Sequence, residues 1–154
     1  IISRVNSIRL SSGSKNPAEL RLKLQKTMQN YAAVFRTGET LTKGMDEVSK
    51  IFKDFSSIGL NDKSLIWNTE LIETLELENL ILQSLATIGS ALNREESRGA
   101  HARDDYKERD DNNWLKHTLA TTNENGSINI TYRAVTLTTL TNDVDPIPPK
   151  KRVY

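Results

Sequence analysis

The sequence predicts a mainly α-helical fold: an antiparallel three-helix bundle, similar to a spectrin repeat, followed by a small antiparallel β-ribbon and an extended C-terminal tail. Two observations carry this prediction. Up to about residue 97, apolar residues recur every three or four positions, which is the spacing of one buried helix face. Beyond residue 114, β-branched residues alternate with polar ones, which is typical of strands.

The first bundle helix is expected at 17–35. Asn16 can cap it, Pro17 takes the first helical position and Glu19 stands three residues after the cap, a combination that favours helix initiation. Its apolar stripe consists of Leu20, Leu24, Met28, Tyr31 and Phe35. The chain opens on IISRV at 1–5 without a methionine, and this start reads as the end of a helix already under way, so we expect further protein upstream.

The second helix is expected at 39–57, with an interruption near Gly38 or Gly44. It should end near Ser57 because Gly59, Asn61 and Asp62 all disfavour a helix. Its apolar stripe consists of Leu41, Met45, Val48, Phe52 and Phe55.

The third helix is expected at 69–97. Glu70 and Glu73 lie in its first turn, where a helix favours negative charge. Its apolar residues cover more than one face, so we expect the central helix, buried on two sides. Leu75, Leu82 and Leu85 should lie in the core.

The rest of this single domain, 1–154, is divided into a charged loop at 98–114, a β-hairpin at about 115–133 and a tail at 134–154. Twelve of the eighteen residues at 94–111 are charged, seven acidic and five basic. The hairpin is predicted because strand-like stretches flank Asn125-Gly126. Residues 136–141 are a candidate for one more short strand, and the prolines that follow exclude regular structure from the tail.

Composition excludes several function classes. The net charge of +1, from 21 basic and 20 acidic residues, gives no case for nucleic acid, which needs a concentrated basic face. No apolar run reaches the ~18 residues that span a membrane. The chain has no cysteine, so it has no disulfides and no thiolate ligands. It also lacks a Gly-rich nucleotide-binding motif, and we expect this chain itself to hold no dinucleotide cofactor, no metal and no catalytic residue.

Three residues of the charged loop, Arg98, His101 and Arg103, are candidate interdomain anchors. Arginine side chains can bind carboxylates or backbone carbonyls of a neighbouring domain through two donors at once. The alternative is a solvated charged face. If they are anchors, their charges should be hydrated in this chain alone, and Gly99 should let the chain leave the third helix in a left-handed backbone conformation.

The remaining polar residues of this region have simpler interpretations. His101 and His117 are expected to be structural, because a catalytic base needs a positioned partner and a cleft. The acidic pairs at 104–105 and 110–111 lack the ligand spacing of a calcium loop. We therefore expect these aspartates to be hydrated or paired with arginine.

Four stretches carry a family resemblance: SRGAHARDDY at 97–106, LRLKLQKTMQN at 20–30 with AAVFRT at 32–37, WNTEL at 67–71 with ETLEL at 73–77, and IPPKKRVY at 147–154. In this order they resemble the C-terminal region of the flavoprotein subunit of succinate dehydrogenase and quinol:fumarate reductase. Residues 1–15 and 43–63 match least. The stretches at 100–106 and 147–154 favour these respiratory enzymes over the more distant L-aspartate oxidases, and the tail at 135–154 looks most like succinate dehydrogenase of bacteria related to mitochondria.

The resemblance implies that the chain is the C-terminal helical domain of a flavoprotein that oxidises succinate to fumarate by hydride transfer to covalent FAD. Its partners would be the upstream FAD and capping domains, which hold the catalytic residues. An iron–sulfur subunit and membrane-anchor subunits would pass the electrons to quinone, at the cytoplasmic face of a bacterial inner membrane. A fumarate reductase flavoprotein and a free-standing helical interaction module stay open as alternatives.

Overall fold

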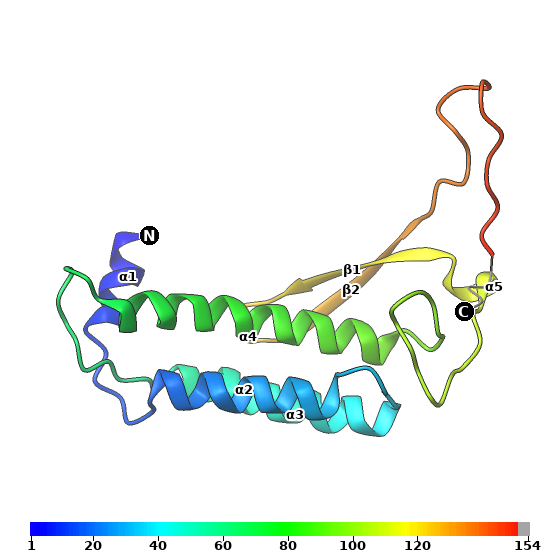
Figure 1. The fold of residues 1–154 in the computed structure, drawn as a ribbon. Helices are drawn as coiled ribbons and strands as arrows, with labels where there is room; N and C mark the ends of the chain where they lie inside the picture. The colour runs from blue at the N-terminus through cyan, green and yellow to red at the C-terminus, as the bar shows by residue number, and fades with distance from the viewer. Residues whose placement is uncertain (151–154) are drawn as a thin grey trace.

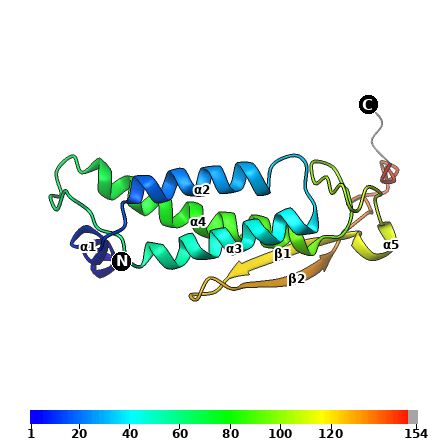
Figure 2. The same cartoon turned by 90° about the horizontal axis from the view of Figure 1, so that it is seen from below.

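The computed structural model of the chain describes residues 1–150 (Figure 1). In chain order, its elements are α1 (Ile2–Arg9), α2 (Pro17–Tyr31), α3 (Gly38–Phe55), α4 (Thr69–Asn93), α5 (Asp111–Trp114), β1 (Lys116–Thr122) and β2 (Ile128–Ala134). Helices α2, α3 and α4 lie side by side, and the strands form a hairpin along them (Figure 1, Figure 2). The prediction of a mainly helical fold with an antiparallel hairpin near the C-terminus is confirmed.

Helix α1 lies where the opening residues read as the end of a helix, and it is additional to the three predicted bundle helices. It buries none of its own residues fully, although Val5 and Ile8 pack against the core and Arg4 pairs with Glu78 of α4. The segment after it runs beside the end of α3, where Gly13 N donates to Ile58 O at 2.9 Å. The first part of the chain is thus attached to one end of the bundle.

Helix α2 ends at Tyr31 and not near residue 35 as predicted. The chain turns there because Thr37 begins the next helix: its hydroxyl accepts from Thr40 N, and the Thr40 hydroxyl accepts from Thr37 N in return. Phe35 therefore lies in the connecting loop and is 80% exposed, so its placement on the buried stripe is wrong.

Neither glycine interrupts the second helix. Gly38 is the first residue of α3, and Gly44 lies within it. A Cβ at Gly44 would lie 2.5 Å from Ile88 Cδ1 and 2.7 Å from Tyr31 Cβ. Gly44 therefore lets α3 approach both neighbouring helices closely.

Helix α4 is the central helix, as predicted, and it ends at Asn93, since Arg94 has an extended backbone. It contacts α1, α2, α3 and both strands. Leu85 is fully buried, and Leu75 is partly buried and packs against the core, whereas Leu82 is only partly buried, which corrects its assignment to the core. The buried positions of this helix are Leu71, Thr74, Leu77, Ile81, Leu85, Ile88, Gly89 and Ala91.

The hairpin pairs Lys116 with Ala134 at its open end and Thr122 with Ile128 next to the turn. Gly126 adopts a φ of +81° in that turn. Ile128 packs against the core, which fixes the hairpin to the bundle. Residues 135–150 form no strand or helix, so no third strand is present at 136–141. The last four residues of the predicted tail, 151–154, lie outside the described residues.

Candidate functional site

The charged loop that follows α4 is organised around Glu96, a carboxylate with no exposed surface. Arg98 Nε donates to it at 2.8 Å, the backbone N of Asp110 donates at 2.9 Å, and Arg94 donates from the other side. Burial alone would raise the pKa of Glu96, but these hydrogen bonds outweigh burial and lower it. Glu96 is therefore a charged, fully bonded centre of the loop.

Arg98 connects this centre to α5. It donates to both oxygens of Glu96 and, at 2.7 Å, to Asp111 Oδ1. Arg109 donates to the other oxygen of Asp111 at 2.7 Å. Beside Arg98, Gly99 adopts a φ of +59° in a tight turn that brings His101 back against Arg98. The left-handed glycine was predicted correctly, but it lies in this turn and not at the end of the helix.

Arg103 is only 3% exposed and holds the C-terminal end of α4. Its Nη1 donates to the carbonyl oxygens of Ala91 at 3.0 Å and Leu92 at 3.2 Å, which lack partners within the helix. Its Nε and Nη2 bind the two oxygens of Asp105, each at 2.8 Å. A positive charge is favourable at this end of a helix.

Asp105 links Arg103 to the start of α3. Its Oδ2 accepts from the backbone N of Gly38, the first residue of that helix, at 2.7 Å. Nearby, Asp104 N donates to Arg36 O at 2.8 Å. The hydrogen bonds from Arg103, and then the one from Gly38, hold the pKa of Asp105 far below its usual range. One ion pair thus joins the end of α4 to the start of α3.

His101 lies between two arginines. Its Nδ1 is 3.4 Å from Arg36 Nη1, and its Nε2 is 3.0 Å from Arg94 O. Because a guanidinium can only donate, Nδ1 must accept, and the ring proton must lie on Nε2 and point to the carbonyl. Burial, together with the charges of Arg36, Arg103 and Arg94, lowers the pKa of His101.

The structure brings Arg98, His101 and Arg103 into one network, but the expectation that their charges would be hydrated is wrong. Their donors are occupied within the chain, since acidic residues alternate with the arginines along the loop. No motif or periodic pattern in the sequence pointed to Arg36 or Glu96 as a site residue. The near balance of acids and bases at 94–111 was the signal that these charges neutralise each other.

The remaining predicted site residues lie apart from this network or pair as expected. His117 lies exposed on β1. Asp110 caps α5, and Asp105 and Asp111 are paired with arginine, which confirms the arginine-paired interpretation for these two residues. Within residues 1–150, no three His, Asp or Glu side chains are placed to hold a metal, and no helix is long and apolar enough to cross a membrane.

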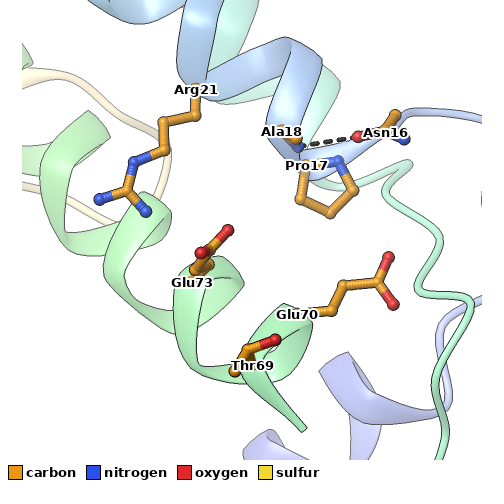
Figure 3. Close-up of a pocket in the computed structure, with 7 residues that line it drawn as sticks. All are labelled: Asn16, Pro17, Ala18, Arg21, Thr69, Glu70 and Glu73. Atoms are coloured by element: carbon orange, nitrogen blue, oxygen red, sulfur yellow. Dashed lines mark hydrogen bonds between the residues drawn. The ribbon is translucent and has the colours of Figure 1, made fainter.

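Two of the hollows on the surface border charged side chains at opposite ends of the molecule. One of about 400 Å³ borders Arg94, Trp114 and Lys116, and the Lys116 ammonium lies 4.0 Å from the ring centre of Tyr132. The other, of about 200 Å³, lies at the opposite end between the first turns of α2 and α4 (Figure 3). The side chains of Arg21, Glu70 and Glu73 lie around it, and none of this geometry resembles a catalytic base paired with a nucleophile.

The sequence of this chain is similar to that of a known protein family. The family described as fumarate reductase flavoprotein C-term matches residues 21–154. The chain belongs to this family. Over its whole length it is 54% identical to the succinate dehydrogenase flavoprotein subunit of Rickettsia bellii, of which it covers 26%.

Two further relatives support the same assignment. The fumarate reductase flavoprotein subunit of Mycobacterium tuberculosis is 38% identical over 95% of the chain, which covers 24% of that protein. The solved structure of a mutant E. coli quinol fumarate reductase matches 99% of this chain and 25% of its own, with a TM-score of 0.89 and 34% identity. The chain therefore spans about a quarter of the length of these relatives. The resemblance seen in its motifs is confirmed.

Proposed function

We propose that the chain is the C-terminal helical domain of the flavoprotein subunit of a succinate dehydrogenase. The whole subunit would oxidise succinate to fumarate and transfer a hydride to covalently bound FAD. The observation that carries the proposal is the 54% identity to a succinate dehydrogenase flavoprotein over all 154 residues. Identity to the fumarate reductase flavoprotein of M. tuberculosis is 38%, so the reverse reaction is the second candidate.

We infer that this domain has a structural part in the enzyme. FAD needs a glycine-rich turn between a strand and a helix. In the described part of the chain, the glycines with positive φ are Gly99, in a turn of the charged loop, and Gly126, in the hairpin. The residues at hand do not fit the flavin, and we assign no redox step to them. The FAD and capping domains upstream would supply the cofactor and the catalytic groups.

The charged loop would stiffen this domain where it meets its neighbours. Arg98, His101 and Arg103 remain our candidates for an interdomain anchor, now acting through the loop that they hold in place. The buried pairs around Glu96 and Arg103 support this proposal because they fix the loop in one geometry. The further partners would be the iron–sulfur and membrane-anchor subunits, at the cytoplasmic face of a bacterial inner membrane.

The test is to sequence the gene upstream of Ile1 and purify the encoded protein with its natural partner subunits. We expect a reading frame with a dinucleotide-binding motif, bound flavin, and dye reduction that depends on succinate. Faster turnover with fumarate and a reduced dye would favour the second candidate. A protein without flavin would overturn the proposal and favour a free-standing interaction module.

A further inference from the structure

The loop between α3 and α4 presents three consecutive large apolar residues to solvent. Leu65, Ile66 and Trp67 are 70, 77 and 94% exposed; we call these three residues the end patch. Folded monomers usually expose such residues singly, and a group of them marks a surface that binds a partner.

The loop has a defined structure. Asn68, only 6% exposed, donates through its side chain to the carbonyl oxygens of Asp62 and Ser64, each at 2.9 Å, and caps α4 by accepting from Leu71 N. Glu70 in turn accepts from the backbone N of Asp62 at 2.9 Å. These bonds hold the loop against the start of α4, so the outward direction of the end patch is built into the fold.

Trp67 also has a strained backbone. Its φ is +53°, a left-handed value that side chains other than glycine and asparagine rarely adopt. Among the described residues, this is the one non-glycine position with a positive φ. A hydrated loop gains nothing from a bulky aromatic in this conformation, whereas strained residues do gather at binding surfaces.

We propose that the end patch is the docking surface for the flavin-binding body of the same subunit. The inference rests on the proposed function. It also rests on the start of the chain, where Arg9 at the end of α1 donates to Lys63 O in this same loop. Helix α1 and the loop lie at one end of the bundle in both views (Figure 1, Figure 2).

The proposed partner of the end patch is the part of the subunit that this chain does not include. The matched relatives are about four times as long as this chain, which covers 24–26% of them, and the family is described as a C-terminal part. The remaining body would therefore join the chain at Ile1, at the same end of the bundle as the end patch (Figure 1, Figure 2). Ile1 and Ile2 are 102 and 79% exposed, so apolar side chains also face solvent where that body would join. An iron–sulfur subunit or a second copy has no such covalent tether.

The charges beside the patch indicate what the facing surface carries. Glu73, which borders the hollow in Figure 3, makes no ion pair with residues 1–150. Arg21, the nearest cation drawn there, is paired with Glu76 at 3.1 Å. We therefore expect the docked surface to be apolar with a basic group at its border.

The test uses the intact flavoprotein subunit in its complex, with Trp67 replaced by the photoreactive p-benzoyl-phenylalanine. After irradiation, mass spectrometry should find position 67 crosslinked to a peptide of the same subunit upstream of Ile1. A crosslink to the iron–sulfur subunit, a crosslink to a second copy, or none would each overturn the inference. The same replacement at Leu22, an exposed residue on the outer side of α2, is the control, and equal capture there would also overturn it.

Flavin content and succinate-driven dye reduction of the same preparation keep the two proposals apart. An active, flavin-containing variant that fails to crosslink contradicts the docking surface alone. An unsubstituted protein without flavin contradicts the proposed function. Bound flavin in the variant also shows that it has folded.

Discussion

Arg103 is a buried charge whose partners all lie within the chain. Such a pair is weak evidence for stability, because desolvation opposes the attraction between the charges. Removing one partner is nevertheless costly, since the groups left behind have lost their bonds to water and gain none in return. For Arg103, those groups are the carbonyls of Ala91 and Leu92 and the carboxylate of Asp105.

Arg103→Ala should therefore lower the free energy of unfolding by about 1–3 kcal/mol. The sequence alone predicted almost no effect in this chain, because it placed the guanidinium in water. Urea unfolding followed by circular dichroism measures the loss. Arg133→Ala, on the exposed face of β2, should change stability by no more than about 0.5 kcal/mol, and equal effects of the two variants would contradict the network.

His101 should make stability depend on pH. Its pKa is lowered in the folded chain, so the unfolded chain binds a proton first as the pH falls. The contribution of neutral His101 is complete above its unfolded pKa of about 6.5 and decreases as the pH falls below it. Protonation would place a hydrogen on Nδ1, which faces Arg36.

Urea unfolding between pH 7.5 and pH 5 checks this dependence, in a range above the lowered pKa values of Glu96 and Asp105. We expect lower stability at pH 5. His101→Gln, which cannot titrate, should remove most of the difference. A dependence that persists in this variant would show that another group causes it.

At the scale of the elements, the sequence predicted the helices well and their ends less well. Periodicity identifies α2, α3 and α4 because each buries one stripe or more along its length. The ends depend on contacts with residues distant in sequence: Asp105 binds the first amide of α3, and Arg103 binds the last carbonyls of α4. No local pattern predicts such contacts. Helix α1 was expected only as the end of a helix at the start of the chain, because its apolar stripe is short: Val5 and Ile8 pack against the core, and no residue is fully buried.

The central position of α4 can be tested with two leucines of the same helix. Leu85 is completely buried, whereas Leu80 is 40% exposed. Leu85→Ala should cost about 2–5 kcal/mol, because it removes buried methyl groups and leaves a cavity. Leu80→Ala should cost much less. Thermal unfolding measures both, and a loss at Leu85 no larger than that at Leu80 would contradict the described core.

The packing of α3 can be tested at Gly44. In Gly44→Ala, the new methyl group would meet Ile88 and Tyr31 at less than 3 Å, so the helices must separate or Ile88 must change its rotamer. We expect a loss of about 1–3 kcal/mol, although alanine favours a helix more than glycine does. Stabilisation of the variant would contradict this close packing, because it would show that the three helices leave space for a methyl group at Gly44.

The two ends of the helical bundle have chemically different surfaces. At the end of α4, ion pairs join the loops so that few donors are left for a partner. At the end where α1 and the α3–α4 loop meet, apolar side chains face water. The sequence predicted the charged loop as the binding surface because its arginines are conspicuous. Exposure, which one sequence does not reveal, adds the end patch around Trp67 as a proposed docking surface.

The described core predicts how the whole chain behaves when it is produced by itself. Ten buried apolar residues from α2, α3, α4 and the α3–α4 loop form one continuous cluster, and a cluster of this kind stabilises a domain without a partner. The purified chain should therefore be helical by circular dichroism and unfold cooperatively. It should also be colourless and should reduce no dye with succinate, because the residues described here do not fit a flavin. Stoichiometric flavin in the purified chain would place the cofactor site within these residues, and a non-cooperative transition would show that the helices need the rest of the subunit to pack.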